Sequence, residues 1–270
     1  MVVQHNLSAM NTNRQLSGIS SAQSKSTEKL SSGYRINRAG DDAAGLSISE
    51  KMRGQIRGLN KASTNAQDGI SLIQVAEGAL NETHSILQRM NELATQAAND
   101  TNTSADRTAI KSEIDQLSSE ITRISTDTKF NTMGLLDGKF TGKNIQVGSL
   151  ASQIISISIS KVDAASLSVN ALAVTSNTKA GESITKIQKA IETVSGYRSN
   201  LGAIQNRLEH TINNLDTTSE NTSAAESRIR DTDMAKEMVE YSKNNILLQA
   251  GQSMLAQANQ QNQGVLSLLQ

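Results

Sequence analysis

The chain contains no proline in 270 residues, and this absence constrains its fold more than any other feature. An average chain of this length would carry about 13 prolines. Proline within a helix costs about 3 kcal/mol, because it removes a backbone hydrogen bond and clashes with the preceding turn. Its absence therefore favours long, uninterrupted helices.

One apolar stripe, with members three or four residues apart, runs through the first half of the chain. Its members are Leu59, Ala62, Ala66, Ile70, Ile73, Ala76, Leu80, Thr83, Leu87, Met90, Ala94 and Ala97. This spacing predicts a single amphipathic helix. At 1.5 Å per residue the stripe spans roughly 58 Å, which is typical of a rod rather than of a compact domain.

Two further stretches repeat this spacing and can supply partner helices. They lie at residues 110–124, after a polar turn at residues 99–104, and at residues 184–215. Three helices of this kind can bury their stripes against one another. Aromatic residues make up only 2% of the chain, so it has few large side chains for a thick globular core.

The pattern changes to strict alternation between the second and third stretches. Three isoleucines alternate with three serines over residues 155–160, which predicts a β-strand. Residues 145–147 and 167–169 can pair with this strand, so we expect a small β-hairpin element on the rod. The glycines at residues 138–142 lack the spacing of a phosphate-binding loop, and we interpret residues 138–143 as a turn.

The amino-terminal segment, residues 4–32, carries a thin apolar stripe that includes Leu7 and Met10. It is followed by Gly33, which is typical of the residue that ends a helix. Gly40, Asp41 and Asp42 then interrupt the chain. An aspartate at this point can accept hydrogen bonds from the free amides of the next helix, so we interpret these residues as a linker and helix cap.

The carboxyl-terminal segment has apolar residues seven apart. They are Met234, Tyr241, Leu248, Leu255 and Leu269, flanked by residues such as Met238 and Leu266. Asn262 interrupts the heptads, so this helix is only partly apolar. The segment therefore predicts a helix that needs a partner.

Both ends of the chain lack charge. No charged side chain occurs from Asn244 to Gln270, and none precedes Arg14 apart from His5. In a helical polymer every subunit repeats each charge, so like charges near the axis would repel one another. Uncharged ends are suited to an axial position. In a lone molecule they bury too little apolar area to offset chain entropy, so we expect them to be disordered until they pair.

Catalytic and metal-binding patterns are missing from the sequence. His5, His84 and His210 lie far apart and form no zinc motif, so we interpret them as surface or seam residues. Asp41 and Asp42 could act as paired carboxylates, but no third ligand lies nearby, and the capping interpretation is favoured. The sequence predicts neither an enzyme nor a cofactor or metal site.

Other function classes are disfavoured by charge and hydropathy. The net charge is zero, which argues against general nucleic-acid binding. The first residues lack the basic and apolar regions of a secretory signal, and no apolar run of about 18 residues exists. We therefore expect no membrane insertion, and any export would use a route without a cleaved signal.

Several blocks of the sequence closely resemble bacterial flagellin. They are residues 30–46 (LSSGYRINRAGDDAAGL), 87–94 (LQRMNELA), 202–208 (GAIQNRL), 227–231 (SRIRD), 252–259 (QSMLAQAN) and 265–269 (VLSLL). The resemblance implies a structural subunit of the flagellar filament that self-assembles through terminal helices and serves swimming motility. It also implies a mainly α fold, in which a long antiparallel helical rod carries a small β-hairpin element and the terminal helices pair.

The resemblance further implies a domain plan. Residues 1–43 and 231–270 would form the inner-tube domain, and residues 44–142 and 179–230 the rod of the outer tube. Residues 143–178 would form the β-hairpin element, and the variable outer domains of larger flagellins would be absent. The protein would leave the cell by the flagellar type III route and reside in the extracellular filament. Expected partners are further copies of itself, an export chaperone, and the filament cap and hook-junction proteins.

In this family the rod is also recognised by Toll-like receptor 5, an innate immune receptor. The positions that match are Gln88, Arg89, Leu93 and Glu113. Asn91 stands where many relatives carry a second basic residue. An alternative role for Leu93 and its neighbours is to pack subunit against subunit, and both roles can hold.

Two other functions remain open at this stage. A hook–filament junction protein would share the architecture but would cap a joint instead of repeating along a filament. A secreted coiled-coil adhesin or receptor ligand would use the rod surface for binding as its primary role.

Overall fold

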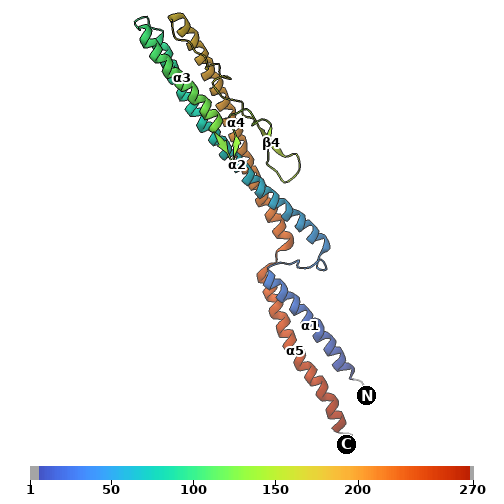
Figure 1. Cartoon of the computed structure of the whole chain (residues 1–270). Helices are drawn as coiled ribbons and strands as arrows, with labels where there is room; N and C mark the ends of the chain where they lie inside the picture. The colour runs from blue at the N-terminus through green and yellow to red at the C-terminus, as the bar shows by residue number, and fades with distance from the viewer. Residues whose placement is uncertain (1–5, 268–270) are drawn as a thin grey trace. The chain divides into compact units, whose positions relative to one another are not determined.

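The structure is a computed structural model that describes residues 6–267, with side chains described as far as Gln260. Its helices are α1 (Leu7–Ser32), α2 (Ala43–Ala97), α3 (Ser104–Asp127), α4 (Asn177–Arg230) and α5 (Met234–Ser267). Its strands are β1 (Lys129–Phe130), β2 (Met133–Gly134), β3 (Lys143–Gln146) and β4 (Ile154–Ile157). The mainly α fold predicted from the sequence is confirmed (Figure 1).

The chain divides into two compact units. Residues up to 54 and from 221 onward form one, here called the terminal unit, and residues 55–220 form the other, the rod unit. The domain boundaries expected from the resemblance, after residues 43 and 230, lie near the start of α2 and at the end of α4, and they stay a prediction. The units divide within α2 and α4, where the buried core ends: its outermost members on these helices are Leu59 and Leu215.

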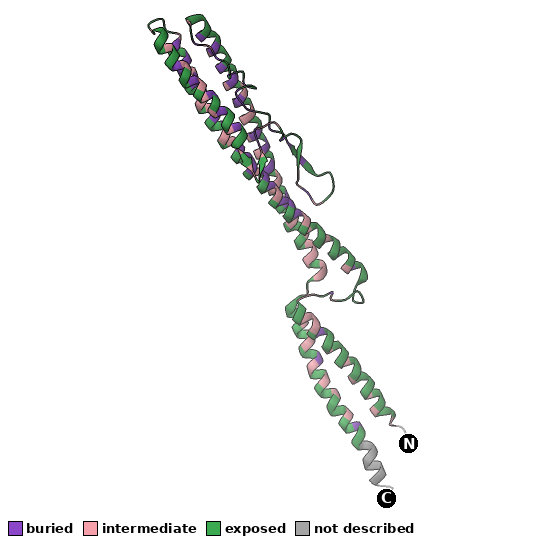
Figure 2. Cartoon of the chain, in the orientation of Figure 1, coloured by how far each residue is buried: buried purple, intermediate pink, exposed green. Residues whose placement is uncertain are grey.

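The rod unit buries the predicted apolar stripes of α2, α3 and α4 against one another, as Figure 2 shows. Every member of the α2 stripe is buried except Ile70, which is half-buried. The chain reverses between α2 and α3, and a capping box starts α3. There the Thr103 hydroxyl accepts from the Asp106 amide at 3.3 Å, and the Asp106 carboxylate accepts from the Thr103 amide at 2.9 Å.

The alternating segment forms one strand of a hairpin on the rod unit. Strands β3 and β4 pair antiparallel with Ile145 opposite Ile155. A second, shorter hairpin, β1 with β2, was not predicted; its turn holds Asn131 and Thr132 at positive φ.

The strand predicted at residues 167–169 is wrong. Ser168 has φ 58°, which breaks an extended backbone, and the amide of Val169 donates to the carbonyl of Ala164 within a turn. Leu167 and Val169 are nevertheless buried. The apolar alternation there reflects two side chains that a turn directs into the core.

Helix α1 ends as the sequence predicts. Gly33 adopts the left-handed conformation, with φ 76°, and its amide donates to the carbonyl of Lys29. Among the described residues, no helix has the length and apolarity needed to span a membrane.

Candidate assembly and recognition surfaces

Helices α1 and α5 of the terminal unit lie side by side and antiparallel (Figure 1). Asn6 Nδ2 donates to the carbonyl of Ala258 at 3.0 Å near one end of the pair, and Lys29 Nζ lies 3.6 Å from a Glu237 carboxylate oxygen near the other. Between them, a Cβ added to Gly251 would lie 3.0 Å from Cδ1 of Leu16. These contacts set one register along the whole pair.

The buried and half-buried residues along the contact between α1 and α5 recur every three or four residues. On α1 they are Ala9, Thr12, Leu16, Ile19, Gln23, Ser26 and Leu30, and on α5 they are Glu237, Tyr241, Asn244, Leu248, Gly251, Leu255 and Ala258. This heptad spacing is typical of a two-stranded coiled coil. Three of the predicted assembly residues, Tyr241, Leu248 and Leu255, therefore lie half-buried along this intramolecular seam.

Three other predicted assembly residues, Leu7, Met10 and Met238, are exposed. We call the exposed apolar side chains of α1 and α5 together the assembly face: Leu7, Met10, Met234, Met238, Val239, Ile246, Leu247 and Met254. Figure 2 shows that α1 and α5 are mostly exposed, in contrast to the helices of the rod unit. The side chain of Leu266 and the whole of Leu269 lie outside the described part of the chain.

Two backbone hydrogen bonds join the chain segment that follows α1 to the segment that precedes α5. The Arg35 amide donates to the carbonyl of Arg230 at 2.7 Å, and the Thr232 amide donates to the carbonyl of Gly33 at 3.0 Å. The guanidinium of Arg230 lies over the ring of Tyr34, 4.7 Å from its centre. Two backbone hydrogen bonds and a cation–π contact thus hold residues 33–35 against residues 230–232.

The carboxylates of Asp41 and Asp42 in the linker accept hydrogen bonds from backbone amides. Asp42 Oδ1 accepts from the Gly45 amide at 2.8 Å, at the start of α2. Asp41 Oδ2 accepts from the amides of Arg38 and Asn37 at 3.0 and 3.2 Å, and these bonds lower the pKa of Asp41.

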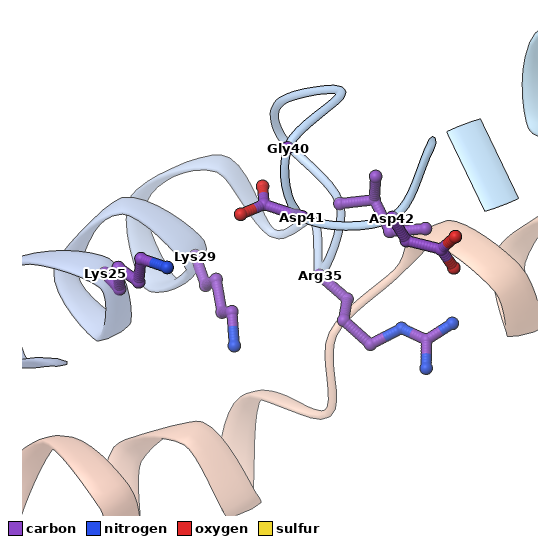
Figure 3. Close-up of a pocket in the computed structure, with 7 residues that line it drawn as sticks. Lys25, Lys29, Arg35, Gly40, Asp41 and Asp42 are labelled. Atoms are coloured by element: carbon purple, nitrogen blue, oxygen red, sulfur yellow. The ribbon is translucent and has the colours of Figure 1, made fainter. Parts of the chain in front are cut away.

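Figure 3 shows the side chains of Asp41 and Asp42 pointing apart. Both line a pocket together with Gly40 and three basic residues, Lys25, Lys29 and Arg35. Within the described residues no group of three carboxylates, histidines or cysteines could hold a metal ion. In this arrangement both carboxylates accept hydrogen bonds from backbone amides, as the capping interpretation expects.

The candidate receptor residues belong to the rod unit, and two of them pair directly. Arg89 Nη2 and Nε lie 3.0 and 3.2 Å from Glu113 Oε1, and Arg89 Nη1 lies 3.2 Å from Glu92 Oε2. These hydrogen bonds raise the pKa of Arg89. Gln88 is exposed and bonds through its side-chain nitrogen to His84 Nε2 at 3.0 Å. The three candidates form an accessible polar patch across α2 and α3.

Leu93 differs from the other three receptor candidates. It is only 2% exposed and belongs to the rod core. It therefore lies beneath the polar patch and supports the packing of α2. Its position in the α2 sequence did not reveal this, because spacing alone does not show which flank α3 covers.

Comparison with known proteins identifies the family. The sequence model of the bacterial flagellin N-terminal helical region matches residues 3–141, and that of the bacterial flagellin C-terminal helical region matches residues 184–269. The chain belongs to the bacterial flagellin family. The blocks that resemble flagellin in the sequence are thus part of a match that covers both ends of the chain.

Individual flagellins agree over their whole length. The flagellin of Halalkalibacterium halodurans is 56% identical over 272 residues, and that of Bacillus subtilis is 52% identical over 304 residues; each alignment covers 100% of both chains. The crystal structure of Bacillus cereus flagellin matches with a TM-score of 0.50 and 33% identity, covering 60% of this chain and 94% of that one. This chain is therefore a structural subunit of the bacterial flagellar filament, which lies outside the cell.

Proposed function

We propose that the chain polymerises through its terminal unit, with the assembly face packed against further copies around the filament axis. The observation that carries this proposal is the combination of exposure and missing charge. Leu7, Met10, Ile246 and Met254 are all exposed and lie in the two charge-free ends of the sequence. An uncharged apolar surface gains free energy when it is buried, and repeated copies of it do not repel one another.

We also propose the domain plan that the resemblance to flagellin implies. Residues 1–43 and 231–270 form the inner tube, residues 44–142 and 179–230 form the rod of the outer tube, and residues 143–178 form its β-hairpin element. The role is structural, without catalysis or a cofactor. The seam between α1 and α5 orients the assembly face, and both helices become fully ordered only when copies pack together.

The experiment that tests this proposal is removal of residues 244–270, with filament seeds offered to the truncated protein. We expect no polymerisation by light scattering or electron microscopy, while far-UV circular dichroism still reports a helical rod unit. Normal filaments from the truncated protein would contradict the proposal. Circular dichroism showing a lone, dilute monomer with fully ordered terminal helices would contradict the coupling of folding to assembly.

Further partners are proposed from the family. An export chaperone fits the assembly face, because covering it before export would prevent premature polymerisation. The filament cap and hook-junction proteins meet the subunit at the two ends of the filament. If this chain were a hook–filament junction protein, it would be a minor part of the extracellular protein sheared from cells. If it is the filament subunit, it should dominate that protein.

Recognition by Toll-like receptor 5 is proposed for the polar patch of Gln88, Arg89 and Glu113, with Leu93 supporting α2 from beneath. The observation in favour is that all three polar side chains are exposed on one rod surface. Arg89→Ala is expected to weaken receptor binding by the monomer without altering its helical content. Unchanged binding by this variant would contradict the proposal. Receptor binding also tests an adhesin role. That role predicts that binding persists in a chain that does not polymerise.

A further inference from the structure

Methionine is placed unusually in the terminal unit. Four methionines are exposed on α1 and α5: Met10 (63%), Met234 (47%), Met238 (50%) and Met254 (59%). The chain contains no cysteine, so thioethers are its most readily oxidised side chains. A flexible thioether is usually used to fill irregular gaps in a core, but these four are open to solvent.

The register of the helix pair relates these residues in space. Asn6 bonds to Ala258, and Leu16 meets Gly251. Because the helices are antiparallel, Met10 and Met254 lie at the same level of the pair. Both belong to the charge-free ends of the sequence, so a polar group added to either would stand on a surface that otherwise carries no charge.

We propose that the exposed thioethers of Met10, Met234, Met238 and Met254 are modification sites at which peroxide-class oxidants reversibly block polymerisation. This inference rests on the proposed assembly face. It adds a regulation that acts on the free subunit, whose thioethers are open to solvent.

The chemistry is a two-electron oxygen transfer. The thioether sulfur attacks one oxygen of hydrogen peroxide, an S–O bond forms, the O–O bond breaks, and the leaving hydroxide takes the proton from the transferred oxygen to become water. Sulfur is oxidised to the sulfoxide and the peroxide is reduced. The sulfoxide side chain is polar and chiral, whereas the thioether is apolar. Burying its oxygen in a subunit contact without a donor opposes assembly.

Two other methionines serve as internal references. Met90 is 0% exposed within the rod core, so it should oxidise far more slowly than the four exposed residues. Met133 is 43% exposed on β2 of the rod unit and is not a member of the assembly face. It should oxidise readily, and its oxidation should leave polymerisation unchanged.

The test treats the full-length monomer with hydrogen peroxide, locates each sulfoxide by mass spectrometry, and measures the critical concentration for growth on filament seeds. We expect a rise of about tenfold or more for the wild type. A quadruple variant with leucine at the four exposed positions should change less than about twofold after the same treatment, because leucine has a similar volume and no sulfur. Met133→Leu should respond as the wild type does.

Reversal provides a second measurement that does not depend on how the quadruple variant folds. Methionine sulfoxide reductases of both stereochemical types, supplied with a dithiol that is oxidised to a disulfide as the sulfoxide oxygen leaves as water, should return the oxidised wild type to its original critical concentration. An oxidised wild type that polymerises at an unchanged concentration would overturn the proposal. Equal loss of assembly in the oxidised quadruple variant would also overturn it, because the effect would then arise elsewhere.

The variant Met254→Asp, with its remaining methionines kept reduced, distinguishes failure of the oxidation proposal from failure of the proposed assembly face. If Met254→Asp does not polymerise while the oxidised wild type does, the oxidation proposal fails and the assembly face stands. If Met254→Asp polymerises normally, the assembly face fails, and the oxidation proposal fails with it.

Discussion

Replacing Leu93 by alanine is expected to destabilise the rod unit, although this residue matches a receptor-recognition position of the family. Leu93 is 2% exposed and shares a core with Leu87 and Ile110. Truncating a buried leucine to alanine costs about 2–5 kcal/mol, because apolar contacts are lost and a cavity remains. For a domain of this size, a cost of about 3 kcal/mol lowers the Tm by about 6–12 °C.

The assay is thermal unfolding of the full chain, followed by far-UV circular dichroism under conditions that do not support polymerisation. Gln96→Ala is the matched control. Gln96 lies one turn further along α2, its side chain is exposed, and only its backbone carbonyl accepts hydrogen bonds. Its Tm should stay within about 2 °C of wild type. A Leu93→Ala Tm equally close to wild type would refute the placement of Leu93 in the core.

Three further changes test local features. Burial raises the pKa of Asp163, but hydrogen bonds from Lys161 and Ser166 outweigh this effect and lower the pKa to about 2. The pKa in the unfolded chain is near 3.8. About 2 kcal/mol of folding stability should therefore be present above pH 4 and disappear as the pH falls to 2. Urea titrations should show that Asp163→Asn lacks this pH dependence, and identical profiles would contradict the assignment. Thr103→Ala removes the cap of α3 and should cost about 1 kcal/mol, seen as a lower urea midpoint, whereas Thr101→Ala outside the cap should not. Gly33→Ala should destabilise the terminal unit by about 1–2 kcal/mol through its left-handed backbone, measured as lower thermal stability of assembled filaments; an unchanged melting curve would argue against this conformation.

Much of the rod was predictable because its signal is local. A helix repeats every 3.6 residues, so the α2 stripe marks both the element and its buried face. Gly33 was predictable for the same reason, since only its own backbone conformation matters. The strand predicted over residues 155–160 followed from a period of two, although β4 covers residues 154–157 and ends before the last three residues of that stretch.

The failures occurred where the same local pattern has two outcomes. Residues 167–169 alternate apolar and polar side chains, but Ser168 adopts a positive φ and the segment turns. The two-residue strands β1 and β2 are too short for any periodicity to reveal. At residues 167–169 the turn places Leu167 and Val169 in the rod core, and sequence spacing alone does not reveal that core.

The sequence by itself determined that this protein has long helices, a charge-free pair of ends and the motifs of flagellin, because each of these is a property of residue order. Only the tertiary structure decided which apolar residues are used within the chain. Tyr241, Leu248 and Leu255 turn towards α1, whereas Met238 and Met254 remain exposed. Both sets have the same chemical character, and what separates them is the register at which two helices far apart in the sequence pack together.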